Sequence, residues 1–300
     1  MPQQRRPGAR AMVSVVTVAA WAGALVLAAG YLGALHPIGD SFAVFREEVA
    51  VATVLLAMLS GPWRPARWAP AAIGALVLAH LALPHLEEAA PGPISVYQKN
   101  MLFVNADWEA LAEDIRAAEP DVALIQEMTG PNYRVVERVS DILPNEIACR
   151  ARDGRVGGTI IVTRYEVVPG SERCERGVVS GRLETPEGPV TFAVVHLRWP
   201  WPYGQTEHVE RILPGLADLE RPVVLTGDLN SAPWSHAAAR LAAAVGAQPL
   251  RPAVESYPLL PLVTLPIDHV FAASGTLERR PLAGSDHYGV LARVSPRPLP

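Results

Sequence analysis

The sequence of 300 residues contains few cysteines, few charged residues and no internal repeat. Without a repeat, the chain is not a solenoid or a propeller, which are built from recurring units of about 20–50 residues. Two cysteines are too few for a disulfide-rich scaffold, and Cys149 and Cys174 either pair in an oxidising compartment or stay as two buried thiols. Charged residues make up only 19% of the chain, and this average hides two different regions.

The first region, residues 1–86, is dominated by apolar runs. Residues 12–35 carry no charged side chain, and as a helix they reach ~36 Å, enough for a ~30 Å hydrocarbon core. That run is too long for the apolar core of an ordinary cleaved signal peptide. Two further blocks are shorter, so a pair of buried or re-entrant helices is the alternative to full spans there. We predict a retained membrane anchor of about three transmembrane helices, at 12–35, 45–62 and 68–84.

The distribution of arginine orients this anchor. The connector 36–45 has no arginine or lysine, whereas arginines precede the first predicted span and lie between the second and third. By the positive-inside rule, the N-terminus and the second connector are cytoplasmic, and everything after residue 83 lies outside. We therefore expect a multi-pass protein of the cytoplasmic membrane, with a linker at 87–93 and an extracytoplasmic catalytic domain at 94–300. The arginines concerned are Arg5, Arg6, Arg10, Arg64 and Arg67.

The second region, residues 94–300, lacks an excess of basic residues. It contains 20 arginine and lysine residues against 25 aspartate and glutamate residues, a net charge of −5. Tight, sequence-independent binding of nucleic acid depends on neutralising phosphates with basic side chains. The composition therefore makes nucleic acid a less favoured partner. Its 207 residues are enough for one substantial hydrophobic core.

Apolar runs of strand length alternate with helical patterns along this region. Strand–helix–strand units followed by antiparallel-looking strands predict an α/β fold of two packed β-sheets with helices outside. The proline-rich stretch 248–266 is expected to form a loop at the rim. Strands are expected at 94–104, 121–128, 159–168, 178–183, 190–197, 223–228, 267–272 and after 287, and helices at 105–118, 135–143, 205–219 and 234–245.

The strand at 223–228 ends in Gly227, Asp228, Leu229 and Asn230. If strand geometry continues, Asp228 and Asn230 project from the same face. A carboxylate and an amide placed together at a strand end are typical of a hard-metal or water-activating site. The alternative is a capped turn followed by a helix. Other strands of the region also carry polar residues at their ends, and this repetition favours a functional site.

Eight polar residues stand at such strand ends: Asn100, Glu127, His196, Asp228, Asn230, Asp268, Asp286 and His287. The motifs QKNM, LIQEM, VVHLRWP, TGDLNSAP, PIDHVF and GSDHYGV, in this order, resemble those of the endonuclease/exonuclease/phosphatase superfamily, the DNase I-like fold. The resemblance spans residues 100–287, essentially the whole second region. It implies a four-layer α/β sandwich preceded here by transmembrane helices. It also implies hydrolysis of phosphoester bonds with Mg²⁺, or alternatively Mn²⁺, as the metal.

The resemblance also implies roles for these residues. Glu127 is expected to bind the metal, with Asn100 beside it. Asp228 is expected to polarise the attacking water, and Asn230 to orient that water or the phosphate.

Two histidines and two further carboxylates complete the expected set. His287 is expected to donate to the phosphoryl oxygens, with Asp268 holding its imidazole protonated. By resemblance, His196 contacts the same phosphate and Asp286 assists the metal or the leaving group. Strand alternation is expected to point His269 away from the site if Asp268 faces it.

The chain departs from the superfamily's pattern at its anchor and at Lys99. Many relatives have a small residue before the motif's asparagine, so the role of Lys99 is open. Arginine-rich insertions like those of DNA-repair relatives are not recognisable. The arrangement of three N-terminal spans and this domain resembles the membrane proteins linked to teicoplanin and vancomycin resistance. That resemblance implies a polyprenyl pyrophosphate or a related lipid phosphate as substrate, with the bilayer as partner.

Two other functions remain as alternatives. One is an extracytoplasmic nuclease or phosphodiesterase, and the other is a non-catalytic binding module on the same fold. Trp199, Trp201 and Tyr203 follow His196 and suit either an interfacial aromatic lip or, as we slightly favour, the packing of a proline-rich loop.

Overall fold

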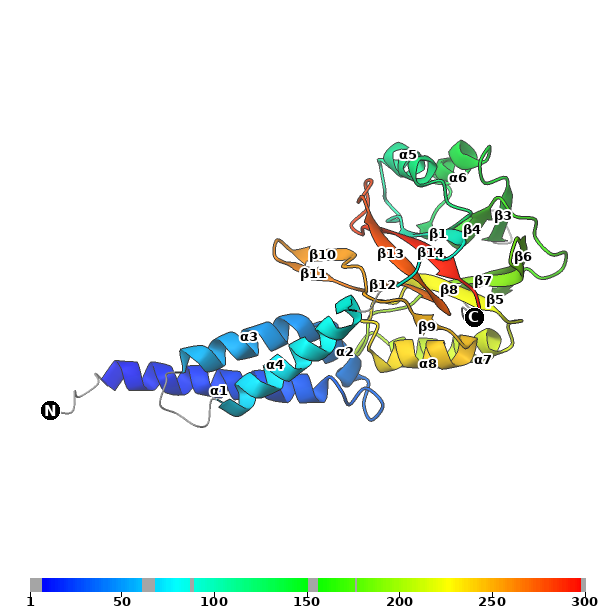
Figure 1. The fold of residues 1–300 in the computed structure, drawn as a ribbon. Coiled ribbons are helices and arrows are strands. Elements are labelled where there is room, and N and C mark those ends of the chain that lie inside the picture. The colour runs from blue at the N-terminus through cyan, green and yellow to red at the C-terminus, as the bar shows by residue number, and fades with distance from the viewer. Residues whose placement is uncertain (1–6, 61–67, 87–88, 151–155, 176, 298–300) are drawn as a thin grey trace. The chain divides into compact units, whose positions relative to one another are not determined.

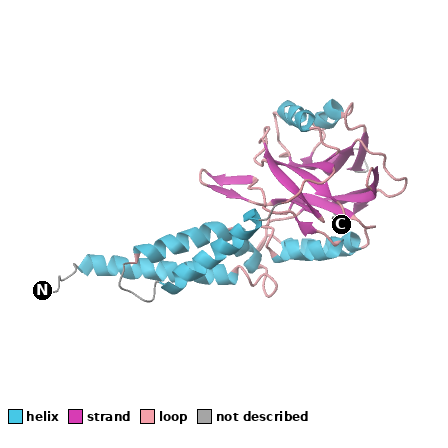
Figure 2. Cartoon of the chain, in the orientation of Figure 1, coloured by secondary structure: helices cyan, strands magenta, loops and turns pink. Residues whose placement is uncertain are grey.

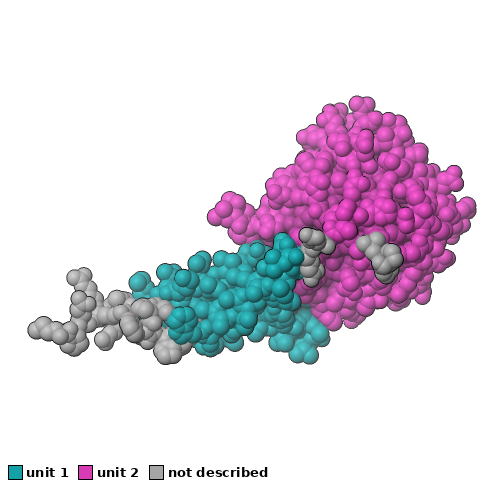
Figure 3. Space-filling model, viewed as in Figure 1, with its two compact units in different colours: residues 1–87 teal, residues 88–300 magenta. Residues whose placement is uncertain are grey.

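The computed structural model describes residues 7–60, 68–86, 89–150, 156–175 and 177–297. The chain divides into two compact units, residues 1–87 and 88–300 (Figure 3). Among the described residues, every strand belongs to the second unit (Figure 2). The following parts of the sequence predictions lie outside the described residues: Arg5, Arg6, Arg64, Arg67, the end of the expected second span at 61–62 and the start of the expected linker at 87–88.

The described residues of the first unit form four α-helices and a short 3₁₀ turn. Two of its helical segments, Met12–Ala29 and Trp68–Leu86, are long and apolar enough to cross a membrane, judged by length and composition alone. The helix at 46–59 has only 14 residues, about 21 Å, and is shorter than a ~30 Å hydrocarbon core. The elements are α1 (Pro7–Ala29), α2 (Ile38–Val44), α3 (Arg46–Leu59), α4 (Trp68–Ala82) and η2 (Leu83–Leu86).

The helices of this unit differ from the expected spans at their ends. The helix expected at 12–35 stops at Ala29, and a turn begins at Gly30. The segment expected as a helix at 45–62 begins one residue later, at Arg46. The Arg46 guanidinium donates to the carbonyl of Gly30 at 2.8 Å and stacks 4.0 Å from the ring centre of Tyr31. This buried arginine therefore ties the start of α3 to the end of α1.

The second unit is built on two six-stranded sheets (Figure 1). Sheet A has the order β13 (Ser274–Arg280), β14 (Gly289–Ser295), β1 (Ile94–Asn100), β2 (Val122–Met128), β4 (Val156–Thr163) and β3 (Asn145–Arg150). Sheet B has the order β5 (Arg173–Glu175), β6 (Val178–Thr185), β7 (Gly188–His196), β8 (Val223–Asp228), β12 (Asp268–Ala272) and β9 (Gln248–Pro249).

Three hydrophobic cores arrange these sheets and their helices in four layers. The central core joins the facing sides of the sheets, for example Val96 and Leu124 of sheet A with Phe192 and Val224 of sheet B. A second core packs two helices on the outer side of sheet A, and a third packs two helices on the outer side of sheet B. This is the predicted four-layer α/β sandwich. The helices are α5 (Trp108–Ala118), α6 (Arg134–Val139), α7 (Gln205–Ala217) and α8 (His236–Val245).

The largest difference from the sequence prediction is the stretch expected as a rim loop. Within 248–266 the structure has β9 and a separate hairpin, β10 (Tyr257–Leu260) and β11 (Val263–Leu265). The hairpin was missed because its residues, YPLLPLVTL, are uniformly apolar and contain two prolines, so they lack the alternation of a half-buried strand. Strands β3, β5 and β13 were also not predicted. Strand β1 ends at Asn100 rather than at residue 104.

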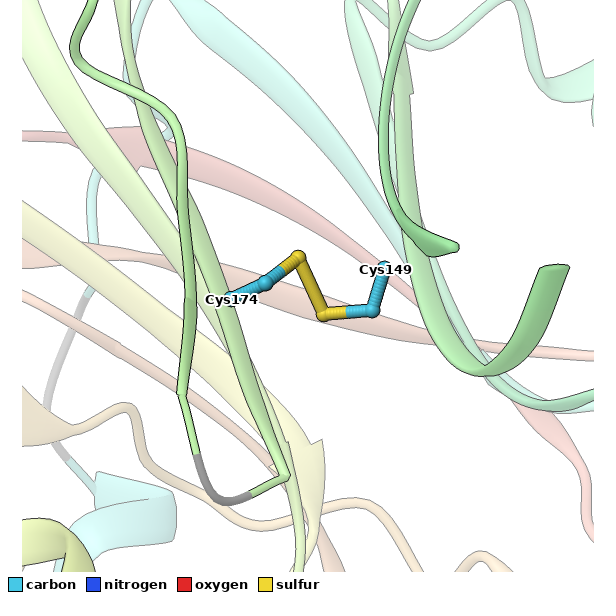
Figure 4. Close-up of a disulfide and its surroundings, with 2 residues drawn as sticks. All are labelled: Cys149 and Cys174. Carbon is cyan, nitrogen blue, oxygen red and sulfur yellow. A yellow bond between two sulfur atoms is a disulfide. The ribbon is translucent and has the colours of Figure 1, made fainter. Parts of the chain in front are cut away.

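The two cysteines form a disulfide that joins the sheets (Figure 4). Cys149 lies in β3 and Cys174 in β5, with their Cα atoms 5.5 Å apart. These strands are the edge strands of sheet A and sheet B. Of the two alternatives that the sequence left open, the structure therefore has the pair rather than two free thiols. Figure 4 shows the bond crossing between the two strands.

Candidate active site

The sheets bring the predicted residues to one edge of the sandwich. Strands β1 and β2 run parallel, as do β7 and β8, so Asn100, Glu127, His196 and Asp228 all lie at or near the carboxyl ends of strands. Strand β12 is antiparallel to β8, which places its first residue, Asp268, directly opposite Asp228. His196 pairs with Asp228 from the other side. His196, Asp228 and Asp268 therefore lie side by side on three neighbouring strands of sheet B.

Glu127 is turned towards the site by an irregularity in its strand. The pairing of β2 with β4 shifts register between Ile125 and Met128, and Glu127 has a φ of 60°. A bulge of this kind re-aims a side chain, and a positive φ in a non-glycine residue is a strained conformation typical of functional sites. The Glu127 carboxylate accepts from the Asn100 amide at 3.0 Å and from the backbone N–H of Phe103 at 3.0 Å.

Asp228 contacts site residues from both sheets, Asn100 of sheet A and His196 of sheet B. Its carboxylate accepts from the Asn100 amide at 3.0 Å and from the backbone N–H of Asn230 at 2.8 Å. The Nε2 atoms of His196 and His287 lie 3.5 Å and 3.7 Å from Oδ2 of Asp228, the oxygen that accepts from Asn100. Burial, together with the nearby Asp268 carboxylate, raises the pKa of Asp228 to about 6. A carboxylate with this pKa is ionised at neutral pH and is a better proton acceptor than an exposed aspartate.

Two backbone features fix Asp228 and Asn230. At Gly227 the strand lies so close to the carbonyl of Val195 that a Cβ would overlap it, so only glycine fits before Asp228. Asn230 has a φ of 48°, and its amide donates to the carbonyl of Leu197 at 2.9 Å. Asn230 thereby links the end of β8 to the end of β7.

A hydrogen-bonded chain lies behind His287. Its Nδ1 is 2.7 Å from Asp268 Oδ2, and the other Asp268 oxygen accepts from the Gln98 amide at 2.8 Å. Burial alone would lower the pKa of His287, but the Asp268 carboxylate raises it to about 9. Burial likewise opposes the charge on Asp268, yet His287 holds the pKa of Asp268 below its ordinary value. The pair is therefore an imidazolium and a carboxylate at neutral pH, and Nε2 of the ring is free to point into the site.

Lys99 holds the loop that carries His287. It is the only lysine in the sequence, and its side chain is buried. Its ammonium donates to the carbonyls of Pro281, Leu282 and His287 at 3.1, 2.6 and 2.6 Å. Burial lowers the pKa of Lys99 to about 8. Lys99, whose role the sequence left open, thus holds the 281–287 loop in place through three backbone carbonyls.

Ser285 attaches the same loop to β1. Its hydroxyl donates to the carbonyl of Asn100 at 2.7 Å and accepts from the backbone N–H of His287 at 3.0 Å. Asp286 between them is exposed. The loop is therefore fixed on both sides of Asp286, which itself reaches the solvent.

The predicted residues line one pocket of about 660 Å³. Asn100 and Asp268 lie behind its surface, hydrogen-bonded to pocket residues. His269 lies on the other side of its strand, with Nε2 2.8 Å from the carbonyl of Ser231, as the alternation predicted. The lining residues are Glu127, His196, Leu197, Arg198, Trp199, Tyr203, His208, Asp228, Asn230, Tyr257, Asp286 and His287.

Comparison with known proteins identifies the family. Residues 100–289 match the Endonuclease/Exonuclease/phosphatase family. The chain belongs to this family. The family is named for nucleases and phosphatases, which cleave bonds to phosphate, and the matched range includes every residue that lines the pocket. No curated protein matches the chain.

Solved structures share the family's fold. An endonuclease/exonuclease/phosphatase from Beutenbergia cavernae has 19% identity and a TM-score of 0.50, covering 67% of this chain and 72% of that one. A family protein from Leptotrichia buccalis has 12% identity and a TM-score of 0.52, covering 67% and 99%. Beta toxin from Staphylococcus aureus has 12% identity and a TM-score of 0.51, covering 67% and 100%. These identities are low, so the likeness establishes the fold and no more.

The side chains of this pocket that could bind a metal suit a hard divalent cation. The carboxylates of Glu127 and Asp228 converge on one amide group, that of Asn100, and on the Nε2 of one imidazole, that of His196. Like charges held this close repel each other, and an oxygen-binding cation would offset the repulsion. A second grouping, Asp228, Asp268 and His287, also has ligand atoms within 4.8 Å of one another. There the 2.7 Å bond between His287 and Asp268 already uses one ligand atom of each. The Glu127 side of the site is therefore the better place for the ion.

Sequence reasoning missed four residues of this family site. Gln98 and Ser285 are hydrogen-bonded to the predicted residues Asp268 and Asn100. Lys99 holds a loop, and the Tyr257 ring lies with its centre 4.8 Å from that of His287. Only Gln98 had a usable signal, because the two-residue period of β1 places it on the same side as Asn100. Tyr257 is distant in sequence and belongs to the hairpin that was not predicted.

Proposed function

We propose that this chain is a membrane-anchored, Mg²⁺-dependent phosphoesterase that hydrolyses a phosphate ester or pyrophosphate of a lipid-linked substrate. We further propose that it acts at the outer face of the cytoplasmic membrane. The observation that carries the proposal is the convergence of Asp228, Glu127 and the His287–Asp268 pair in one pocket. Its carboxylates suit a metal and a water, and its imidazolium suits a phosphate.

Glu127 would hold the metal, Mg²⁺ or Mn²⁺, with Asn100 beside it. In this structure Asn100 presents its NH₂ group to Glu127 and Asp228, so its Oδ1 would become a ligand only when the amide turns over. When bound, such an ion neutralises charge on phosphate oxygens and on a leaving oxygen. The Asn100 amide lies 3.0 Å from Glu127 and 3.0 Å from Asp228, so it couples the metal side of the pocket to the proposed base.

Asp228 is the proposed general base for the attacking water. Its pKa, raised to about 6, is still below neutral pH, so Asp228 is charged there. The raised pKa also makes it a better proton acceptor than an ordinary aspartate. The backbone N–H of Asn230 fixes one carboxylate oxygen, which leaves the other to face the pocket. Asn230 also lines the pocket and is proposed to orient the water or the phosphate.

His287 and His196 are the proposed phosphate-binding groups. His287 is charged at neutral pH, and its Nε2 faces Asp228, the proposed base for the attacking water. Donation from a fixed cation at this point stabilises negative charge that develops on phosphoryl oxygens. His196 approaches the same Asp228 oxygen at 3.5 Å from the next strand. Asp286, exposed at the mouth, is proposed to assist the metal or the leaving group.

The lipid-linked substrate is proposed from the anchor. Two helical segments of the first unit are long and apolar enough to cross a membrane. An enzyme tethered in this way meets substrates that lie in the bilayer at high local concentration. The resemblance of the whole arrangement to teicoplanin- and vancomycin-resistance membrane proteins supports a polyprenyl pyrophosphate. The outward orientation is proposed from the arginine distribution together with an odd number of spans. Because α1 and α4 alone would return the chain to the cytoplasmic side, α3 is proposed to cross the membrane as well, or α3 and α4 to form a re-entrant pair.

A substrate panel tests this proposal. The full-length protein, in lipid nanodiscs with Mg²⁺, would be given a polyprenyl pyrophosphate, a sphingomyelin-type diester, and single- and double-stranded DNA. We expect hydrolysis of the polyprenyl substrate, lowered about 10²–10⁴-fold by Asp228→Ala and His287→Ala and unchanged by Glu184→Gln, an exposed control. Cleavage of DNA alone would support the nuclease alternative. No turnover of any substrate would support the binding module.

Orientation has its own test. A reporter fused after Pro300 that is active only outside the cytoplasm should be active in cells. If a reporter that works only in the cytoplasm is active instead, the proposed topology is wrong, whatever the substrate panel shows.

A further inference from the structure

Exposed large apolar side chains of the second unit gather on a few loops. Among its described residues, all of them fall in three short segments, 103–104, 201–203 and 259–262. Leu262 is the extreme case, with 97% of its surface exposed. A soluble domain normally scatters such residues singly, and a gathered set marks an interaction surface. The seven residues are Phe103, Val104, Trp201, Tyr203, Leu259, Leu260 and Leu262.

Each of the three segments is attached to the pocket. Segment 103–104 follows the end of β1, and the backbone N–H of Phe103 donates to the Glu127 carboxylate. Segment 201–203 follows His196, and Tyr203 lines the pocket itself. Segment 259–262 is the tip of the β10–β11 hairpin, whose base residue Tyr257 packs against the His287 ring. The apolar side chains therefore belong to the rim of the pocket and not to a distant face.

The hairpin has the composition of a segment that enters a lipid layer. Residues 256–267 contain no charged side chain. The three leucines at its tip, Leu259, Leu260 and Leu262, are 38%, 60% and 97% exposed around Pro261 at the turn. The hairpin projects from the rest of the second unit (Figure 1). Trp201 and Tyr203 are residue types that favour the boundary between headgroups and acyl chains.

We propose that these seven residues form a lipid-docking rim, which seats the mouth of the pocket on the surface of a bilayer. This inference rests on the proposed function and deepens it, because the phosphate would then enter the pocket directly from the membrane. The leucines of the hairpin tip enter the acyl region, and Trp201 and Tyr203 lie at the headgroups.

The bilayer is the occupant that this chain's own sequence favours. Only residues 87–93 separate η2 of the first unit from β1 of the second, so the apolar helices tether the pocket to the membrane in which they sit. Association with that membrane is then intramolecular and needs little affinity. A protein groove would instead need a complementary partner for three separate loops.

A label at the hairpin tip tests the docking directly. The full-length Leu262→Cys variant, in lipid nanodiscs, would carry an environment-sensitive fluorophore on its one free thiol, since Cys149 and Cys174 are paired. The matched control is Glu187→Cys, exposed at the β6–β7 turn, the opposite end of β7 from His196. Lipids with a quencher on the acyl chain should quench the label at 262 at least about fivefold more than the label at 187. Equal quenching at both positions would overturn the proposal.

Kinetics separate this inference from the proposed function. Leu259, Leu260 and Leu262 would be replaced together by serine, and activity compared on a bilayer-embedded substrate and on a short-chain, water-soluble analogue with the same phosphate group. We expect the apparent KM for the embedded substrate to rise about tenfold or more, with kcat/KM for the soluble analogue within about twofold of wild type. Activity on the soluble analogue shows that the variant is folded.

The possible outcomes are distinct. A wild type that turns over neither substrate while the label at 262 is quenched removes the proposed function and leaves the docking. Turnover of the embedded substrate without quenching, or a triple variant with unchanged KM, overturns the docking and leaves the function. If the label at 262 changes only in native membranes and not in pure lipid, the rim binds a protein and the proposal fails.

Discussion

Replacing Asp268 by asparagine tests the hydrogen-bonded chain behind His287. In the wild type, one Asp268 oxygen accepts from the Gln98 amide at 2.8 Å and the other faces Nδ1 of His287 at 2.7 Å. Gln98 is itself held by Gln126 at 2.9 Å, so it continues to offer a donor. The single oxygen of an asparagine would therefore face Gln98, and its NH₂ group would face His287. Nδ1 of His287 must then accept, which forces the ring into its neutral form.

The size of the effect follows from the pKa of His287. With a pKa of about 9, about 97% of the ring is charged at pH 7.5. Without the Asp268 charge the pKa of His287 falls, because burial lowers it and only the Asp228 and Asp286 carboxylates still raise it. A fall to the ordinary histidine value of about 6.5 would leave about 10% of the ring in the charged form. We expect kcat at pH 7.5 to fall at least about tenfold from lost protonation alone.

The sign of the pH dependence makes the test sharper. His287 acts in its charged form, so wild-type activity should fall as pH rises through about 9. It should also fall as pH drops through about 6, where Asp228 takes a proton. In Asp268→Asn the upper limit moves down from about pH 9, because the carboxylate that raises the pKa of His287 most is lost, and the lower limit also moves down because Asp228 loses a repelling neighbour. The optimum therefore becomes acidic.

The assay is kcat as a function of pH between about 5 and 10, at saturating Mg²⁺ and substrate, for the full-length protein in nanodiscs. Glu278→Gln, an exposed change in β13, is the matched control and should keep the wild-type profile. If Asp268→Asn keeps an upper limit near pH 9, the reasoning about Asp268 and His287 is wrong. A uniform loss at all pH values would likewise contradict it.

Three further predictions follow from the contacts described above. Lys99→Met removes the donor to three carbonyls and should lower the free energy of unfolding by about 3 kcal/mol, with kcat reduced as well, measured by denaturant titration and turnover. Replacing Cys149 and Cys174 by serine should lower it by about 3 kcal/mol and leave kcat unchanged, since β3 and β5 carry no site residue. A chelator should abolish turnover, Mg²⁺ should restore it, and Glu127→Gln should raise the Mg²⁺ concentration needed at least about tenfold.

The elements that the sequence predicted well are those whose signal is local. Strands β2, β8 and β12 are short apolar blocks, each with a carboxylate near one end, and their side chains meet as the resemblance implied. Two packed sheets with outer helices followed from the alternation of strand and helix patterns, and the four-layer sandwich followed from the resemblance. In the first unit three spans were expected, and the described residues contain two helical segments that meet the length and hydropathy of a span, so the number of spans stays a prediction.

What the sequence could not show depends on contacts between distant residues. The bulge at Glu127 arises in the pairing of β2 with β4, and nothing in LIQEM marks it. The pairing of Asp268 with Asp228 joins strands 40 residues apart, so only the register of sheet B reveals it. The hairpin at 257–265 has exposed apolar residues at its tip. Apolar residues of a strand are usually on a buried face, so the sequence pattern did not indicate this hairpin.

Lys99 shows how one unexplained residue acquires a physical role. Burying an ammonium is costly, and burial does lower its pKa, to about 8. Three carbonyls of the 281–287 loop, at 2.6–3.1 Å, partly offset that cost, so the loop is held where the ammonium can reach all of them. One of these carbonyls belongs to His287, whose ring faces Asp228 on the other sheet. The residue that departs from the superfamily's pattern therefore fixes the distance between the proposed base and the proposed phosphate-binding cation.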